Sequence, residues 1–403
     1  MKIGIIREGK TPPDKRVPLS PEQCEQILND YPQVELYVQK SEIRKFKDVE
    51  YERAGIAVVD SVEHCDVLLG VKEVPKDELI PNKKYFFFSH TFKKQPYNRD
   101  LLQAVIDKNI QLIDWEVITN AKGQRLIAFG KYAGIVGCYN GFLTYGKKSK
   151  SFDLKPAHEC EDREEMEAQL VNVKLPANFK IVLTGKGRVG GGAIETISCM
   201  PQIKEVEPAD FLSKKFDGPV YTVLNVDDYN RTKDGSEFVR KEFYANPAEN
   251  YESAFMDYAK VADMYIACHY WDNKAPFIFT RDDAKDKDWN IKVVADVSCD
   301  IDCAVASTIK PSTIADPIYG YNPQTESEDD FMKDGVIAVM AVDNLPCELP
   351  KDASVDFGEM FLEHVLEPLL GNDPHQIIER ASETKNGKLT SHFAYLQDYL
   401  EGK

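Results

Sequence analysis

A glycine-rich turn constrains the fold of this 403-residue chain more than any other feature. The apolar run Ile181–Leu183 leads through Thr184 into the spacing G-x-G-x-x-G, whose glycines are Gly185, Gly187 and Gly190. A helix-compatible stretch follows directly. Such glycines permit a tight turn, close approach of phosphates and close packing of the helix, whose positive end faces the phosphates. The sequence therefore predicts a Rossmann-like unit that binds a dinucleotide.

The second strand of such a unit normally ends in an acidic residue, which binds a ribose hydroxyl about 20 residues after the glycine turn. Glu207 fits this position best, and Glu205 is the alternative. A carboxylate there favours NAD, because it repels a 2′-phosphate. NADP stays open as the cofactor because three lysines lie nearby, namely Lys204, Lys214 and Lys215.

Composition and charge exclude several classes of protein. The formal net charge of −17 argues against nucleic acid or an anionic membrane as partner, because binding phosphates needs a basic face. Nine scattered cysteines without C-x-x-C spacing indicate neither a disulfide framework nor a metal site. The apolar runs are too short to span a membrane, and the first residues resemble a strand and lack the layout of a signal peptide. We expect a cytoplasmic protein.

Two series of alternating strands and helices predict an α/β protein. In the first series, the expected strands are Ile3–Ile6, Val34–Val38, Val67–Val71, Tyr85–Ser89 and Ile110–Asp114, and the expected helices are Pro21–Leu28 and Arg99–Asp107. In the second, the expected strands lie near Ile181–Leu183, Ile203–Glu207, Val220–Leu224, Met264–Cys268 and Lys292–Val297.

These series predict two Rossmann-like domains with the active site in an interdomain cleft. The dinucleotide-binding domain is expected to cover residues 131–326, ending at an acidic tract. The substrate domain is expected to combine residues 1–130 with 327–403, because the C-terminal helices are too few to form a domain of their own.

Two ionisable side chains follow apolar strands of the first series, where a cleft would receive them. Lys72 follows Val67–Val71, and His90 follows Tyr85–Ser89. Burial and cationic neighbours lower the pKa of a lysine, and imidazole titrates near neutral pH, so the two side chains suit acid/base catalysis. His269 follows a strand of the second series and is expected to line the cofactor site.

Eight short blocks carry a resemblance to a known family. They are Arg7–Pro21, Gly70–Pro75, Phe87–Thr91, Leu112–Glu116, Ala128–Gly134, Gly187–Ala193, Asp296–Asp300 and Val342–Pro346. Together they resemble the lysine-forming saccharopine dehydrogenases and the lysine-ketoglutarate reductase half of the bifunctional lysine-degrading enzyme, within the alanine dehydrogenase and transhydrogenase superfamily. The resemblance spans nearly the whole chain.

This resemblance implies roles for particular residues. Lys72 and His90 match the acid/base pair, and Arg16 and Arg125 match binders of substrate carboxylates, a role that suits the guanidinium fork. Further substrate contacts match Gln95, Phe129, His269, Tyr270 and Trp271, and cofactor contacts match Arg188, Val189, Glu207, Asp296, Val297 and Ser298. Gln124 stands where a relative has an arginine for cofactor phosphates, and Lys186 lies inside the glycine turn, so the choice between NAD and NADP stays open.

The expected activity is a reversible, nicotinamide-dependent oxidation of saccharopine to L-lysine and 2-oxoglutarate. The partners would be a small amino acid and a 2-oxo acid, and the protein could be a monomer or a homo-oligomer. Alanine dehydrogenase, which needs the same residue types, is the leading alternative, followed by another opine-type dehydrogenase. A non-enzymatic nucleotide sensor on the same fold is a third hypothesis.

Overall fold

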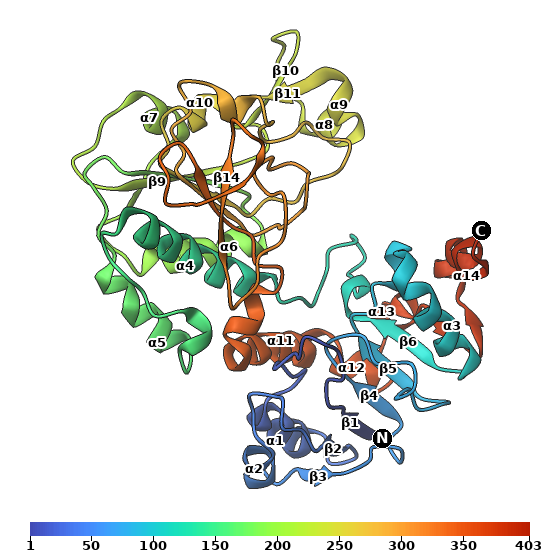
Figure 1. The fold of residues 1–403 in the computed structure, drawn as a ribbon. Coiled ribbons are helices and arrows are strands. Elements are labelled where there is room, and N and C mark those ends of the chain that lie inside the picture. The colour runs from blue at the N-terminus through green and yellow to red at the C-terminus, as the bar shows by residue number, and fades with distance from the viewer. The chain divides into compact units, whose positions relative to one another are not determined.

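The computed structural model describes residues 1–247 and 249–403, which form two compact units (Figure 1). The terminal unit consists of Met1–Phe129 and Pro350–Lys403, and the central unit consists of Gly130–Leu349. Both contain a mainly parallel sheet with helical crossovers, so the predicted α/β class with two Rossmann-like domains is confirmed. No helix among the described residues is both long and apolar enough to cross a membrane.

The terminal unit contains a six-stranded sheet in the order β3-β2-β1-β4-β5-β6, in which every neighbouring pair is parallel. Its strands are β1 (Lys2–Ile5), β2 (Glu35–Gln39), β3 (Ala57–Val59), β4 (Val67–Leu69), β5 (Lys84–Phe87) and β6 (Gln111–Asp114). A short hairpin near the C-terminus adds β17 (Thr384–Lys385) and β18 (Lys388–Leu389). Because the six strands are parallel, the residues after β4 and β5 lie at one edge of the sheet.

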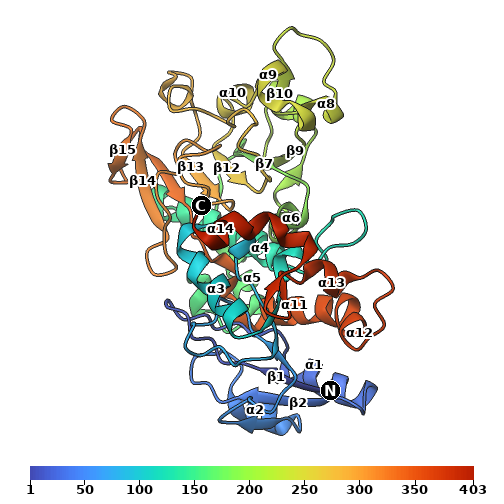
Figure 2. The ribbon, with the colours of Figure 1, turned by 90° about the vertical axis from the view of Figure 1, so that its right-hand side faces the viewer.

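Helices connect some of these strands, and others follow the last strand of the sheet and complete the terminal unit. They are α1 (Pro21–Asp30), α2 (Asp48–Arg53), α3 (Arg99–Asp107), α11 (Pro350–His364), α12 (Leu366–Leu369), α13 (Ile377–Ala381) and α14 (Gln397–Glu401). Helix α1 begins at Ser20, which forms a reciprocal capping box with Gln23. Helix α11 contacts the sheet end through Phe357, whose ring meets the Trp115 ring at 5.2 Å. Figure 2 shows the same elements from the side.

The central unit contains an eight-stranded sheet in the order β15-β14-β16-β13-β12-β7-β9-β8. Its strands are β7 (Lys180–Thr184), β8 (Lys204–Glu205), β9 (Val220–Leu224), β12 (Met264–Ala267), β13 (Val293–Asp296), β14 (Ile318–Asn322), β15 (Ser327–Asp329) and β16 (Ile337–Met340). A separate hairpin pairs β10 (Asn230–Thr232) with β11 (Tyr251–Ser253).

The return of the chain to the terminal unit differs from the sequence-based expectation. That expectation placed it at residue 327, after the acidic tract, whereas the structure places it at Pro350. The acidic tract forms β15, the edge strand of the central sheet, and β16 then pairs in parallel with β13. Charged residues are typical of edge strands because they oppose further pairing, so the tract does not mark the end of the domain.

Helices of the central unit are α4 (Gly130–Ser149), α5 (Arg163–Ala168), α6 (Arg188–Ser198), α7 (Pro208–Ser213), α8 (Arg240–Ala245), α9 (Pro247–Asn250) and α10 (Met256–Ala259). Figure 1 shows α4 and α6 side by side. A Cβ atom on Gly134 would lie 1.8 Å from the Val189 carbonyl oxygen, and one on Gly192 would lie 2.0 Å from that of Lys131. The two helices therefore touch backbone to backbone, which fixes the helix that begins at the glycine turn.

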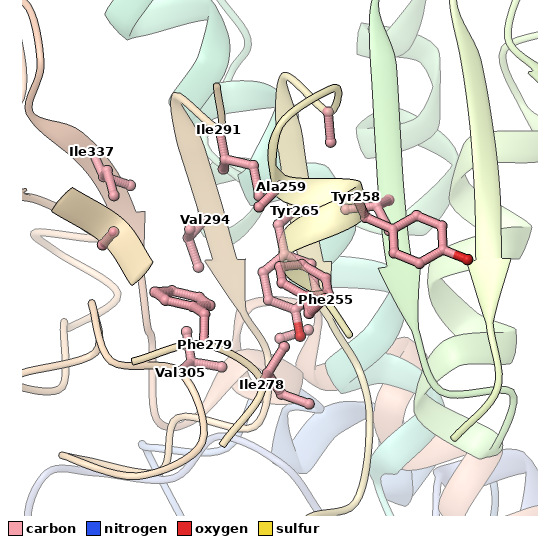
Figure 3. Close-up of a cluster of buried hydrophobic side chains, with 14 of the residues drawn as sticks. Phe255, Tyr258, Ala259, Tyr265, Ile278, Phe279, Ile291, Val294, Val305 and Ile337 are labelled. Atoms are coloured by element: carbon pink, nitrogen blue, oxygen red, sulfur yellow. The ribbon is translucent and has the colours of Figure 1, made fainter. Parts of the chain in front are cut away.

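An aromatic core supports the central sheet beneath this turn. Figure 3 shows Phe255, Tyr265 and Phe279 lying together beside β12 and β13. The rings of Phe255 and Tyr265 are 4.6 Å apart, and all three side chains are buried. This packing holds β12 in place, so the residues that follow β12 have a fixed position next to the glycine turn.

Candidate functional site

The glycine turn of the central unit connects β7 to α6. Gly185 has a φ of +95°, and a Cβ atom there would lie 2.7 Å from the Cys268 carbonyl oxygen. Around Gly187, which caps α6, nothing lies within 4 Å of the Cβ position. The backbone N–H groups at the start of α6 therefore face open space, and such a helix start binds phosphate.

A cavity of about 550 Å³ adjoins this turn within the central unit. Its walls come from the glycine turn, the end of β9 with Asn225 and Val226, the segment His269–Trp271, and α8 with Arg240 and Tyr244. This volume lies within the usual range for ligand pockets. The geometry is therefore suited to a nucleotide whose phosphates lie on the turn.

The strand order changes the argument for the ribose-binding residue. Glu207 was predicted as the acidic residue at the end of the second strand, about 20 residues after the glycine turn. In the structure, β9 lies next to β7, and β8, which precedes Glu207, lies one strand further out. Glu207 is exposed and does not line the cavity, and Glu205 accepts a hydrogen bond from Tyr221 at 3.2 Å. Asn225 directly follows β9, the strand that lies next to the glycine strand.

A buried polar chain lies beneath the cavity. The Thr184 hydroxyl is 2.8 Å from the Tyr265 hydroxyl and 2.9 Å from Nδ1 of His269. Burial lowers the pKa of His269 to about 4, so its ring is neutral at neutral pH. Its Nε2 is buried and has no hydrogen-bond partner among the described residues. A buried polar atom without a partner is costly, and this observation fits a bound group that supplies one.

Lys72 and His90 follow β4 and β5, which are parallel neighbours in the terminal unit. The N–H of Phe88 donates to the Val71 carbonyl at 2.9 Å, which joins the two strand ends. The backbone N–H of Lys72 donates to Glu8 at 2.8 Å. The structure therefore brings the two predicted acid/base loops together.

The imidazole ring of His90 is held by the carboxylate of Glu73. Its Nδ1 lies 2.8 Å from Oε1 of Glu73, and Oε2 of Glu73 accepts from Lys10 Nζ at 2.6 Å. Burial would raise the pKa of Glu73, but the hydrogen bonds from His90 and Lys10 outweigh it and lower that pKa to about 2. Glu73 is therefore ionised and accepts the Nδ1–H, which leaves Nε2 as the proton-exchanging atom of His90.

A buried glutamate supports the Lys72 loop. Glu8 accepts the N–H groups of Val71 and Lys72 at 2.7 and 2.8 Å. Burial, followed by the charge on Asp14, raises the pKa of Glu8 to about 8 despite these two hydrogen bonds. The loop that bears Lys72 therefore rests on a group whose charge changes near neutral pH.

The two predicted carboxylate binders differ in environment. Arg16 is buried, and its Nε and Nη2 donate to the two oxygens of Asp14 at 3.0 and 2.6 Å. Its guanidinium also lies 4.1 Å from the centroid of the Phe129 ring. Arg125 is 37% exposed and lies 3.5 Å from Glu116. Arg16 is thus held in a buried ion pair, whereas Arg125 is partly exposed.

The other predicted substrate contacts are distributed over both units. In the terminal unit, Gln95 Oε1 is buried without a hydrogen-bond partner among the described residues, and Phe129 stacks on Phe357 at 4.4 Å. In the central unit, Tyr270 is 91% exposed, and the Trp271 indole donates to the Pro276 carbonyl at 3.1 Å. Gln95 and Tyr270 have polar groups that can meet a ligand.

Comparisons with known proteins agree with this geometry. Residues 4–136 match the family described as Alanine dehydrogenase/PNT, N-terminal domain. The chain is 29% identical to alpha-aminoadipic semialdehyde synthase of Arabidopsis thaliana, over 98% of this chain and 41% of the relative. It is 27% identical to saccharopine dehydrogenase [NAD(+), L-lysine-forming] of Schizosaccharomyces pombe, over 90% and 91% of the two chains. The chain is thus similar to lysine-forming saccharopine dehydrogenases, and its N-terminal third matches the alanine dehydrogenase/PNT family.

The fold of this chain is also similar to a solved L-alanine dehydrogenase, with a TM-score of 0.66 at 16% identity over 100% of this chain and 99% of that one. At this identity the likeness concerns the fold alone. The chain spans less than half the length of the plant synthase that it matches.

The remaining family positions lie around the glycine turn and after β13. Arg188 and Val189 begin α6, and both line the cavity. Asp296 is fully buried and accepts from Ser298 Oγ at 2.6 Å and from Thr308 Oγ1 at 2.7 Å. Val297 packs against α4 at Gly137. Asp296 and Val297 thus hold the loop after β13 in shape.

Sequence reasoning missed Glu73, Lys10 and Glu8, which surround the two acid/base loops. Glu73 had a signal, because it directly follows Lys72 within a family block. Glu8 also lies in a block, but nothing in its spacing indicates that it accepts the Lys72 backbone N–H. Such partners become visible only when β1, β4 and β5 are placed side by side.

Proposed function

We propose that this chain is a nicotinamide-dependent oxidoreductase that interconverts saccharopine with L-lysine and 2-oxoglutarate. The observation that carries the proposal is the Lys72 and His90 loops on adjoining strand ends, in a chain that matches a saccharopine dehydrogenase along nine-tenths of its length. The central unit contributes the nucleotide-binding turn. The terminal unit contributes acid/base groups and arginines of the type that such a substrate needs.

The reaction consumes saccharopine, oxidised cofactor and one water, and it yields lysine, 2-oxoglutarate, reduced cofactor and one proton. When bound, the nicotinamide ring takes the hydride from the carbon next to the secondary amine. Protons must leave the amine and the attacking water, and one must reach the departing lysine nitrogen. His90 exchanges protons through Nε2 because Glu73 holds Nδ1, and Lys72 is the second proton-transfer group.

Two observations support a nicotinamide dinucleotide as the cofactor. Gly187 opens onto free space at the start of α6, and His269 Nε2 is a buried polar atom without a partner beside the same cavity. Four cationic side chains and one acidic side chain line this cavity among the described residues. Asn225, at the end of β9, carries no charge. This balance favours the 2′-phosphate of NADP, whereas Glu207 alone had favoured NAD.

Asn225→Asp tests this choice of cofactor. The carboxylate would bind ribose hydroxyls and repel a 2′-phosphate, so we expect the ratio of kcat/KM for NADPH to that for NADH to fall by about 10-fold or more. Glu207→Gln is the matched control, and it should leave the ratio unchanged because Glu207 lies beyond β9. If Glu207→Gln moves the ratio and Asn225→Asp does not, Glu207 is the ribose partner after all.

Arginine substitutions separate substrate binding from stability. Arg16→Ala removes the guanidinium that forms a buried ion pair with Asp14, so we expect the free energy of unfolding in urea to fall by about 3 kcal/mol or more. Arg125→Ala should leave that free energy within about 0.5 kcal/mol of the wild type. We expect it instead to raise the KM for saccharopine by about 10-fold or more. Equal stability of the two variants would contradict the structural role of Arg16.

The rival activity, alanine dehydrogenase, shares the fold. The absorbance of the reduced nicotinamide ring distinguishes the two when each cofactor is offered lysine with 2-oxoglutarate, or ammonia with pyruvate. Oxidation of the reduced cofactor only with lysine and 2-oxoglutarate supports the proposal. Turnover only with pyruvate would replace it by alanine dehydrogenase, and cofactor binding without turnover on either pair would favour a nucleotide sensor.

A further inference from the structure

Two carboxyl groups outside the proposed reaction converge beneath the His90 loop in the terminal unit. Asp114 ends β6, and Glu383 lies between α13 and β17; neither side chain is exposed to solvent. The Ser89 hydroxyl is 2.6 Å from Oδ2 of Asp114 and 3.1 Å from Oε1 of Glu383. One side chain that directly precedes His90 thus contacts both carboxyl groups.

Asp114 has the surroundings of an ionised carboxylate. Its Oδ2 accepts the backbone N–H of Ser89 at 2.7 Å and that of His90 at 3.2 Å, and its Oδ1 accepts the N–H of Glu116 at 2.7 Å. Because a backbone N–H can only donate, these bonds favour the ionised form and oppose the rise in the pKa of Asp114 that burial causes. Asp114 therefore fixes the backbone of the His90 loop directly.

Glu383 has the surroundings of a neutral carboxylic acid. Its side-chain partners are the hydroxyls of Ser89 and Thr91, which also contact each other at 2.7 Å. Hydroxyls donate or accept, so they accommodate a proton on Glu383. Two negative charges in one buried site are unfavourable. Burial, followed by the charge on Asp114, raises the pKa of Glu383 to about 8.

Three other titratable groups among the described residues face the pair. Tyr395 in the 3₁₀ helix Ser391–Leu396 and Tyr399 on α14 face Glu383, and Glu116 faces Asp114. The pKa values of both tyrosines are raised by burial, so they remain neutral where Glu383 titrates. The segment that carries Glu383 is fixed to the sheet, because the Glu383 N–H donates to the Leu112 carbonyl at 2.8 Å.

His90 needs such support because its φ is +55°, in the left-handed region that is unfavourable for residues other than glycine. We propose that ionised Asp114 and neutral Glu383 are positioning residues that hold the loop Ser89–Thr91, and with it His90, in this conformation. The proposal rests on the proposed function of His90. It also gives the C-terminal segment a positioning role, because Glu383 contacts Ser89 although the two residues are 294 positions apart in the sequence.

The proton on buried Glu383 makes the free energy of unfolding depend on pH. Glu383 binds a proton in the folded protein up to about pH 8 and in the unfolded chain only up to its ordinary pKa of 4.5. The folded state therefore holds the extra proton between these values, and the free energy of unfolding falls as the pH rises through that window. Glu8 adds a similar slope, since its pKa is also about 8.

The test uses Glu383→Gln, an uncharged isostere of the proton-bearing form, in the full chain. We expect the midpoint of urea unfolding to fall less steeply with pH than in the wild type, by the equivalent of one proton. At neutral pH we expect kcat within about twofold of the wild type and an unchanged KM, because the neutral contacts remain. The ratio of kcat at about pH 9 to kcat at about pH 7 should rise.

Two further variants sharpen the result. Asp114→Asn places an amide where three backbone N–H groups donate, and we expect kcat to fall by about 10-fold or more with little change in KM. Glu379→Gln is the matched control on α13, and it should change neither slope nor kcat because its side chain is half exposed and paired with Lys385.

An unfolding slope for Glu383→Gln equal to that of the wild type would overturn the inference, whatever the turnover. The failure of the proposed function is distinguishable, since it would appear as no turnover on saccharopine with the predicted change in slope intact. If Asp114→Asn does not fold, Glu383→Gln still decides the question because it preserves shape and hydrogen bonding.

Discussion

A carboxylate at position 187 is expected to abolish nucleotide binding by the central unit while leaving its fold intact. Gly187 opens onto free space, so the side chain of Gly187→Asp meets no protein atom within 4 Å at its Cβ. It would point to where the phosphates approach the start of α6. Like charges at an interface cost several kcal/mol, so we expect the affinity to fall by about 10²-fold or more in calorimetry.

Gly187→Asn is the matched control, because it adds nearly the same volume without the charge. We expect it to weaken binding much less than Gly187→Asp does. Gly190 is unsuitable for this test, since a Cβ atom there would lie 2.0 Å from the Gly185 carbonyl oxygen and would distort the turn itself. Unchanged affinity in Gly187→Asp would show that the nucleotide does not bind at this turn.

Loss of either proposed acid/base side chain should have the second large effect. Lys72→Met and His90→Gln are each expected to lower kcat by about 10²-fold or more, the usual scale for a general acid or base. Nucleotide affinity should stay near the wild-type value because the glycine turn lies in the other unit. Initial rates with saturating saccharopine measure the first quantity, and calorimetry with the cofactor measures the second.

Surface residues of the same types provide controls. Lys76→Met removes a lysine that is 55% exposed and paired with Asp100, and His375→Gln removes an exposed histidine. Neither should change kcat. The pH profile of kcat/KM should have two limbs in the wild type, and each variant should flatten one of them. Full turnover with both limbs retained in Lys72→Met and His90→Gln would exclude the proposed roles.

The strand ends that bear Lys72 and His90 were predictable because each follows an apolar run, and parallel strands present their carboxyl ends at one edge. The lateral order of the central strands was not predictable. β8 is only two residues long, and no feature of Lys204 and Glu205 indicates that β9 lies between them and β7. The prediction of Glu207 depended on that order, which the residues themselves do not encode locally.

The C-terminal boundary and Glu383 were missed for different physical reasons. Ser327–Asp329 is acidic because it forms a solvent-exposed edge strand, and composition alone does not distinguish such a strand from a linker. Glu383 follows a short helix and has no periodic pattern. Its contacts with Ser89 and Thr91 arise only from tertiary structure. The pairing of Arg16 with Asp14, two residues away, was also missed, because it gives no signal in the sequence.

The division of the terminal unit into two chain segments also sets an order for folding. The central unit is one uninterrupted segment, so its contacts close shorter loops than those joining Met1–Phe129 to Pro350–Lys403. Closing a long loop costs entropy before its contacts form, and high contact order slows folding. We therefore expect the loop that bears His90 to acquire its final shape late, when the segment around Glu383 reaches β6. A partly folded chain would hold the nucleotide turn before it holds an organised acid/base loop.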